Sequence, residues 1–248
     1  MTSPRRTPLQ IADADPRTCN HDVRVRSLAR VPFFAGLSQR ALVDVDSRCG
    51  MRGVVADEVV YRAGQPATRL YVIAQGAVKL SRRTSEGRDL LADVLASGEH
   101  FGTLPALGEE RYVDSARALT PGCMLSLDTA QLGAVLDAYP QVARAALTAI
   151  AGRLRDAQDR AHRLSVATAE QRLAATLLLL ADRLGIHRGD LLVINAPLTR
   201  DELAGLAGLA PETASRILAQ LRRDGAIDTG RRWVAVRDRA ALEALATS

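Results

Sequence analysis

The sequence predicts an α+β fold made of a jelly-roll-like antiparallel β-roll, a long helix and a C-terminal winged helix-turn-helix. Three patterns predict these parts: short glycine-punctuated apolar runs between about Arg30 and Ala130, a heptad repeat after Pro140, and two short helices followed by a hairpin. A chain of 248 residues can hold two ordinary domains. We expect a flexible tail over 1–20, the roll over 21–137, the long helix over 138–165 and the winged helix-turn-helix over 166–248.

The first half of the chain has the pattern of short antiparallel strands. Its apolar runs are β-branched or leucine-rich, and glycines lie between or beside them. The runs are 54–55, 59–61, 70–73, 78–80 and 90–95. Ser85 to Arg88 has the composition of a hairpin turn between the last two runs. This spacing favours a barrel or roll over an alternating α/β fold.

A long helix follows Pro140, a residue suited to the first position of a helix. Apolar residues then recur at alternating spacings of four and three, which is the pattern of a helix–helix seam. The seam consists of Leu147, Ile150, Leu154, Ala157, Ala161 and Leu164. Because charged residues flank it on both sides, we expect a homodimerisation helix; a single helix in the core of its own domain is the alternative.

The C-terminal part contains two capping-box patterns, Thr168 to Gln171 and Thr199 to Glu202, each at a predicted helix start. The first helix should end at Gly185, and the second breaks at Gly208. A third helix should start at Pro211, with an inner face of Ala214, Ile217, Leu218 and Leu221. Two short helices around a glycine turn form a helix-turn-helix pattern, and the hairpin predicted around 229–232 resembles a wing.

The outward residues of the third helix have side chains that can contact DNA bases. Arginine can donate two hydrogen bonds to guanine, glutamate can accept one from cytosine, and serine can bond to either. We therefore expect base contacts from Glu212, Ser215 and Arg216; an ion pair between Glu212 and Arg216 on a solvated helix is the alternative. The expected contacts to the DNA backbone are Thr199, Thr213, Arg222, Arg223, Arg231 and Arg232.

Composition and motifs exclude several other classes. No apolar run approaches the ~20 residues of a membrane helix, and no apolar stretch follows Arg5 and Arg6, so we expect a cytoplasmic chain without a signal peptide or membrane partner. The net charge of +5 is spread along the chain and permits a nucleic-acid partner without requiring one. Nucleophile-elbow, phosphate-loop and zinc-protease motifs are missing, so we expect no enzyme and no catalytic residues.

The motifs together resemble the CRP/FNR family of bacterial transcription regulators over about residues 28–245. The matching segments are Tyr61 to Gly64, Ala67, Leu70 to Ile73 and Gly76 in the roll, and Thr199 to Ala204 and Pro211 to Leu218 in the helix-turn-helix. The resemblance implies a cyclic-nucleotide-binding-type β-roll, a homodimer, double-stranded promoter DNA as a ligand and RNA polymerase as a partner. An alternative is a dimeric redox, gas or small-ligand sensor whose winged helix is mainly a protein-interaction module.

The recognition helix is more similar to the FNR branch of this family, whose Glu-x-x-Ser-Arg pattern matches Glu212, Ser215 and Arg216. The cAMP-receptor branch usually has arginine and glycine where this chain has Pro211 and Ser215. The resemblance therefore implies a palindromic site with half-sites near TTGAT rather than TGTGA, separated by roughly one helical turn.

The effector segment departs from the family pattern. Cyclic-nucleotide binders carry Gly-Glu followed by Arg-Ser or Arg-Thr, in which glutamate contacts the ribose and arginine the phosphate. Here Thr103 follows Gly102 in place of glutamate, and Tyr112 and Val113 fall where arginine and serine should be. Arg111 could replace that arginine only after a shift of register. Because a buried phosphate needs a charged partner, we expect no control by cAMP.

The cysteines and histidines give no clear cofactor. Cys19, Cys49 and Cys123 lie far apart without a C-x-x-C pair, which in a cytoplasmic chain indicates ordinary thiols rather than disulfides or a metal site; direct thiol oxidation stays open. A cubane iron–sulfur cluster normally takes four cysteines, and the chain has three. His21 and His100 are the candidate haem ligands. The residues support neither cofactor, and they do not determine the effector, the target genes or whether the protein activates or represses.

Overall fold

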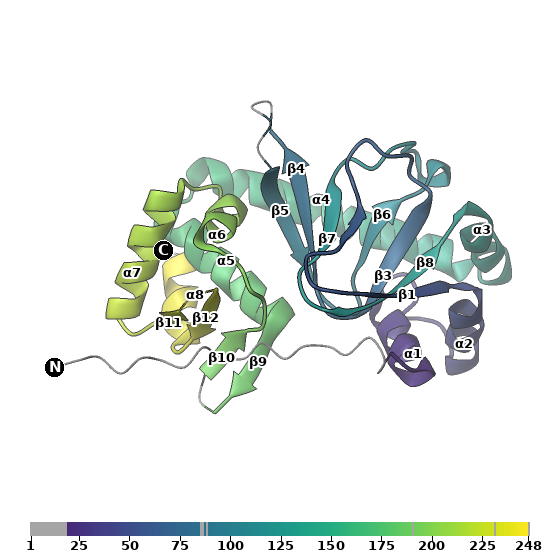
Figure 1. The fold of residues 1–248 in the computed structure, drawn as a ribbon, viewed down its shortest axis with the longest axis horizontal. Helices are drawn as coiled ribbons and strands as arrows, with labels where there is room; N and C mark the ends of the chain where they lie inside the picture. Colours follow the sequence, from purple (N-terminus) through teal and green to yellow (C-terminus); the bar gives the residue numbers. More distant parts are fainter. Residues whose placement is uncertain (1–18, 85–86, 88, 190, 231, 248) are drawn as a thin grey trace. The chain divides into compact units, whose positions relative to one another are not determined.

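The computed structural model describes residues 19–247 except 85–86, 88, 190 and 231, so the predicted turn at 85–88 and most of the predicted tail lie outside the described residues. The described chain divides into two units, one ending at Ala161 and the other starting at His162. No helix in the described part is long and apolar enough to cross a membrane. The predicted α+β fold, with a β-roll and a C-terminal helix-turn-helix, is confirmed (Figure 1).

The first unit contains two four-stranded antiparallel sheets, with strand orders β1-β8-β3-β6 and β2-β7-β4-β5. The strands are β1 (Gly50–Val54), β2 (Val59–Tyr61), β3 (Arg69–Gln75), β4 (Val78–Arg83), β5 (Asp89–Leu95), β6 (His100–Thr103), β7 (Ser115–Ala118) and β8 (Gly122–Leu127). Four of the predicted runs fall on β2 to β5, whereas the run 54–55 meets β1 only at Val54, and β6, β7 and β8 were not predicted. β4 and β5 pair as the predicted hairpin, from Val78 opposite Leu95 to Arg83 opposite Asp89.

The central strands β3 and β8 are buried on both faces, which explains their continuous apolar sequence. Side chains alternate between two cores: Tyr71 and Met124 point between the sheets, whereas Leu70, Val72 and Cys123 join a core on the opposite face. The helices α1 (His21–Arg30), α2 (Gln39–Arg48) and α3 (Thr129–Ala138) contribute to this second core. The sequence analysis did not predict these three helices.

The long helix α4 covers Gln141–Val166, close to the predicted bounds, and begins directly after Pro140. Its first turn contributes the buried Val142 to the second core of the roll. Further along, Leu147, Ile150 and Leu154 are 69%, 59% and 59% exposed, so the seam is uncovered in the single chain. Ala157 is also exposed, while the side chains of Ala161 and Leu164 lie outside the description.

The second unit contains a four-stranded sheet of order β11-β12-β10-β9 with four helices. Its elements after α4 are α5 (Ala169–Leu184), β9 (Gly185–Arg188), β10 (Leu191–Ile194), α6 (Arg200–Ala207), α7 (Pro211–Arg223), β11 (Ile227–Gly230), β12 (Trp233–Val236) and α8 (Arg239–Thr247). The predicted helix end at Gly185 is confirmed, and the backbone of this glycine is extended. A side chain would not fit at this position, because a Cβ would lie 2.1 Å from the Ala181 carbonyl oxygen. The hairpin β9–β10 and helix α8 were not predicted.

Candidate nucleic-acid interface

The turn between α6 and α7 is built by local sequence signals. The Thr199 hydroxyl accepts from the Glu202 backbone N–H at 3.1 Å, and the Glu202 carboxylate accepts from the Thr199 N–H at 2.8 Å, which completes the predicted capping box. Gly208 ends α6 with φ +64°, a left-handed conformation that glycine adopts at low cost. Pro211 then occupies the first turn of α7, where its missing N–H costs nothing.

Helix α7 has one buried face and one exposed face. The inner residues Ala214, Ile217, Leu218 and Leu221 are at most 6% exposed, as the spacing predicted. On the opposite side Glu212 and Arg216 are exposed, while Thr213 and Ser215 are half-buried. The burial of one face therefore fixes which side chains α7 offers to a ligand, and these include the three expected base contacts.

The expected DNA-backbone residues differ in how their side chains are used. The Thr199 hydroxyl caps α6 and is therefore already hydrogen-bonded. A DNA phosphate at this point would meet the N-terminus of α6 rather than a free hydroxyl group. Arg222 and Arg223 are exposed in the last turn of α7, and Arg223 donates to Gln220. Arg232, at φ +62°, lies in the hairpin turn and donates through Nε to the Pro197 carbonyl at 3.2 Å. Arg231 lies outside the described residues.

Comparisons with known proteins decide the family. A Crp-like helix-turn-helix domain model matches residues 171–245, and a cyclic nucleotide-binding domain model matches residues 51–139. The chain is 33% identical over 215 residues to the cyclic AMP receptor protein of Thermus thermophilus, covering 87% of this chain and 96% of the relative. This chain belongs to the CRP/FNR family.

Two further comparisons agree with this assignment. A CRP-like cAMP-activated global transcriptional regulator of Mycobacterium tuberculosis is 29% identical over 198 residues, which cover 80% of this chain and 88% of that protein. The structure of FixK2 from Bradyrhizobium japonicum superposes with a TM-score of 0.68 at 28% identity, over 79% of this chain and 96% of that one. The CRP/FNR chain is accordingly a DNA-binding transcription regulator, and its family consists of regulators rather than enzymes.

The effector segment of this CRP/FNR chain places its expected residues in different surroundings. Thr103 pairs with Arg69 across β3 and β6. The Arg111 side chain stays exposed and donates through Nη1 to the Gly64 carbonyl at 2.7 Å. Val113 is 53% exposed. The segment therefore gathers neither the carboxylate nor the guanidinium that the family pattern directs at a cyclic nucleotide.

Tyr112 instead points into the interior of the roll, where it is only 4% exposed. Its ring stacks on Tyr61 with centroids 3.7 Å apart and an interplanar angle of 15°. Its hydroxyl donates to the Arg69 carbonyl (3.0 Å) and accepts from the N–H groups of Arg69 (3.0 Å) and Thr68 (3.3 Å), which uses its full hydrogen-bonding capacity. A Cβ on Gly102, which has φ +77°, would lie 2.8 Å from the Arg69 carbonyl oxygen, so this packing needs glycine there.

Beside Tyr112, Tyr61 and Asp114 form a partly buried pair. The Tyr61 hydroxyl donates to Asp114 Oδ1 at 2.9 Å. Burial and the adjacent carboxylate raise the pKa of Tyr61, so the phenol stays protonated and remains the donor. Burial also raises the pKa of Asp114, against the opposing effect of the hydrogen bond from Tyr61. Sequence reasoning missed this pair because its members lie more than 50 residues apart.

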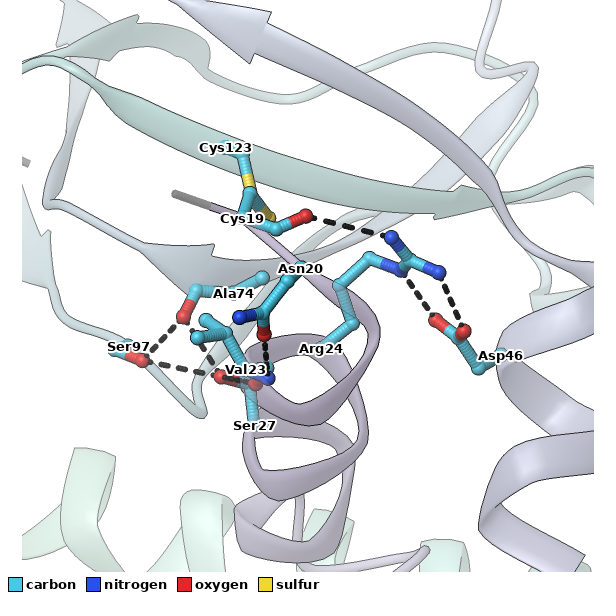
Figure 2. The surroundings of a disulfide bond; sticks show 9 residues. All are labelled: Cys19, Asn20, Val23, Arg24, Ser27, Asp46, Ala74, Ser97 and Cys123. Atoms are coloured by element: carbon cyan, nitrogen blue, oxygen red, sulfur yellow. Dashed lines mark hydrogen bonds and ion pairs between the residues drawn. A yellow bond between two sulfur atoms is a disulfide. The ribbon is translucent and has the colours of Figure 1, made fainter. Parts of the chain in front are cut away.

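The cysteine expectation was wrong for two of the three residues. Cys19 and Cys123 form a disulfide, with Cα atoms 6.3 Å apart across 104 residues of sequence (Figure 2). The sequence does not predict this pairing, because the segment before α1 comes close to β8 only when the roll has packed. Cys49 is the free cysteine of the structure. Cys19 also lies within the predicted tail, yet it is buried in the second core.

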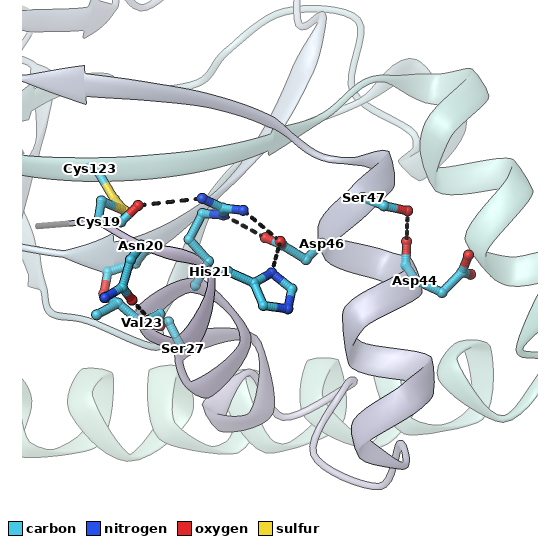
Figure 3. Close-up of polar contacts among 11 residues, drawn as sticks. Cys19, Asn20, His21, Val23, Ser27, Asp44, Asp46, Ser47 and Cys123 are labelled. Atoms are coloured by element: carbon cyan, nitrogen blue, oxygen red, sulfur yellow. Dashed lines mark hydrogen bonds and ion pairs between the residues drawn. A yellow bond between two sulfur atoms is a disulfide. The ribbon is translucent and has the colours of Figure 1, made fainter. Parts of the chain in front are cut away.

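The two candidate haem ligands have other partners. His21 Nδ1 lies 2.9 Å from Asp46 Oδ2 (Figure 3). The same carboxylate accepts from Arg24, as Figure 2 shows. His100 packs edge-on against Phe33, with ring centroids 4.8 Å apart. Within the described part of the chain, no three His, Cys, Asp or Glu side chains are grouped closely enough to hold a metal ion.

Proposed function

We propose that this regulator acts in the cytoplasm as a homodimer that binds a palindromic promoter site, with half-sites near TTGAT, and contacts RNA polymerase there. The observation that carries the proposal is the division of α7: its apolar face is buried, and Glu212, Ser215 and Arg216 lie on its other side. These types of side chain bond to base edges in the major groove. Arg222 and Arg223, exposed at the end of the same helix, are suited to phosphates.

Fluorescence anisotropy with duplexes of matched length tests the sequence preference. One duplex carries two TTGAT half-sites, a second two TGTGA half-sites, and a third the same bases scrambled. We expect Arg216→Ala to weaken binding to the first duplex by ~1–3 kcal/mol, about 5- to 150-fold, with little effect on the scrambled one. The control Arg222→Ala should weaken binding to all duplexes and reduce the salt dependence. Equal binding of wild type and Arg216→Ala to the TTGAT duplex would exclude base contact by Arg216.

The homodimer proposal rests on the exposed seam of α4. Leu147, Ile150 and Leu154 recur at heptad spacing and expose more than half of their surface. Exposing such an apolar stripe to water is unfavourable. A second copy of the same helix would bury it by knobs-into-holes packing of the seam residues. The dimer would also place two recognition helices on a two-fold symmetric site, which one chain cannot do.

The dimer is tested by light scattering with two variants of equal charge. Ile150→Glu places a carboxylate on the seam, whereas Thr148→Glu places it two residues away, on an exposed position outside the seam. We expect a monomer for Ile150→Glu and a dimer for Thr148→Glu, with a matching loss of affinity for the palindrome only in the first variant. A monomeric wild-type chain that binds the palindrome as one copy would contradict the proposal.

We further propose that cAMP does not control this protein, although the relatives from Thermus thermophilus and Mycobacterium tuberculosis are named for cAMP. The support is the packing of Tyr112, whose buried ring and fully bonded hydroxyl occupy the position where the family pattern has its phosphate-binding arginine. A phosphate placed there would lose water without gaining a charged partner.

Titration calorimetry with cAMP and cGMP tests this point, and the same nucleotides are added to the DNA-binding assay. We expect no heat of binding and no change in affinity for the palindrome at millimolar nucleotide. Saturable binding of cAMP that also shifts the DNA affinity would overturn the proposal while leaving DNA recognition by α7 intact.

A further inference from the structure

The Cys19–Cys123 disulfide joins the segment before α1 to an interior strand of the roll. Cys123 lies on β8, between β1 and β3, with its side chain fully buried on the face covered by the helices. Cys19 is 6% exposed and lies two residues before α1. Figure 2 shows the bond between the start of α1 and the strand behind it. The bond therefore attaches the first described segment of the chain to the middle of a sheet.

Noncovalent contacts hold the same segment in place. Asn20 caps α1 by accepting from the Val23 N–H at 3.0 Å. Arg24 donates through Nη1 to the Cys19 carbonyl at 3.4 Å, and through Nε and Nη2 to the Asp46 carboxylate at 2.8 Å each. His21, also on α1, has its Nδ1 2.9 Å from Asp46 Oδ2, the oxygen that Arg24 Nη2 also bonds (Figure 3). These bonds depend on neither sulfur, so we expect them to hold Cys19 near β8 after the disulfide is reduced.

The third thiol is chemically separated from the pair. Cys49 packs against the same core, but it is only partly buried and makes no disulfide. Burial, with a smaller contribution from the Asp46 charge, raises the pKa of Cys49 to about 12.

We propose that Cys19 and Cys123 are a reversible redox site, oxidised to the disulfide by hydroperoxides and reduced by cellular dithiols. The inference rests on the proposed function, because a regulator bound to DNA works in a reducing compartment, where disulfides are rare and usually sense redox state. The disulfide form clamps α1 to β8. It thereby tightens the core that also receives Val142 from the first turn of α4.

The chemistry balances with hydrogen peroxide as the oxidant. The Cys19 thiolate attacks one peroxide oxygen, so that an S–O bond forms, the O–O bond breaks and water leaves after protonation. The Cys123 sulfur then attacks the sulfenic sulfur, so that the S–S bond forms and a second water leaves. Two electrons pass from the two sulfurs to the peroxide, and the two thiol protons end in the two waters. A dithiol reverses the reaction by thiol–disulfide exchange.

Thiol counting on the full-length protein tests the site. The reduced wild type has three thiols in denaturant, and one equivalent of hydrogen peroxide should leave one. Cys49→Ser should fall from two to none, and Cys19→Ser should keep both of its thiols. A dithiol should restore the starting counts. Non-reducing peptide mapping should recover the peptide that joins Cys19 to Cys123.

Thermal unfolding of the same samples measures the clamp. All four tyrosines precede residue 162 and the single Trp233 follows it, so tyrosine circular dichroism reports the first unit and tryptophan fluorescence the second. Because the bond closes a loop of about a hundred residues, oxidation should raise the Tm seen by tyrosine by roughly 5–10 °C in wild type and Cys49→Ser. We expect no rise in Cys19→Ser. Comparing the oxidised and reduced forms of one chain avoids dependence on a variant that folds poorly.

Three results would overturn the redox site: three thiols that persist after peroxide, thiol loss that is equal in Cys19→Ser, or disulfides formed only between chains. A bond that forms without raising the Tm would overturn the clamp. DNA binding is measured separately, on reduced protein, so a failure to bind the palindrome leaves the thiol counts interpretable, and a failure of the redox site leaves the DNA result intact.

Discussion

Removing the Tyr112 hydroxyl should destabilise the roll without disturbing the winged helix. In Tyr112→Phe the ring keeps its stack on Tyr61, but three backbone hydrogen bonds to Thr68 and Arg69 are lost. A bond of this kind contributes ~0.5–1.5 kcal/mol, and Thr68 is exposed enough for water to replace part of the loss. We therefore expect a decrease of ~1–3 kcal/mol in the free energy of unfolding. Tyr112→Ala should lose more, about 3–5 kcal/mol, because it also removes the buried ring.

Urea unfolding followed by two signals measures this effect. Three tyrosines remain in the variant to report the roll, and Trp233 reports the other unit. Tyr139→Phe is the matched control, since it removes one hydroxyl bond to Asp44 (3.0 Å) from a half-buried site. We expect the tyrosine transition to move to lower urea further in the Tyr112 variants than in Tyr139→Phe, with the tryptophan transition unchanged. A Tyr112→Phe variant as stable as Tyr139→Phe would refute the assignment of Tyr112 as a fixed part of the interior.

Three further perturbations concern the same unit. Hydrogen bonds from Arg24 and His21 hold the pKa of Asp46 below its usual range in spite of burial. The contribution of this carboxylate to stability is therefore complete above the unfolded pKa of about 3.9 and is lost as pH falls through the lower folded value. The stability gap between wild type and Asp46→Asn, measured by urea unfolding from neutral to acid pH, should close over that acidic range, and a constant gap would contradict this reasoning. Gly122→Ala should lower the free energy of unfolding by roughly 1–3 kcal/mol or more, because the added Cβ would lie 2.0 Å from the Gln75 carbonyl oxygen. An unchanged Tm in a thermal melt would show that the backbones at Gly122 and Gln75 are not packed this closely. Gly133 lies within α3, and a Cβ added there would have no atom within 4 Å. Because alanine favours a helix over glycine, Gly133→Ala should stabilise the unit by ~0.5–1 kcal/mol in the same melt, and a loss of stability would contradict the helical assignment of this residue.

The helices of the C-terminal unit were predictable because their signals are local. The Thr168 and Thr199 capping boxes each place a hydroxyl beside an N–H three residues later, and both form as predicted. The inner face of α7 follows from helical periodicity, and all of its predicted residues are buried. Neither signal depends on residues distant in the sequence.

The missed elements lacked such signals. Helix α1 carries charged residues among its few apolar ones, and it is placed by packing of Val25 and Leu28 in the second core rather than by a clear periodicity. Strand β7 is the short segment Ser115–Ala118, which is apolar only at its two alanines. Both owe their structure to neighbours in the folded roll, so tertiary context outweighs local propensity there.

The sequence by itself therefore determined the order of the parts, the caps and turns of the helix-turn-helix, and which face of α7 is buried. Only the tertiary structure decided that Cys19 meets Cys123, that Tyr112 stacks on Tyr61 inside the roll, and that Arg24 and His21 both contact Asp46. The physical reason is the range of the interactions. Capping and periodicity act within a few residues, whereas these contacts join segments from 22 to 104 residues apart, which approach one another only after two sheets and their covering helices have packed.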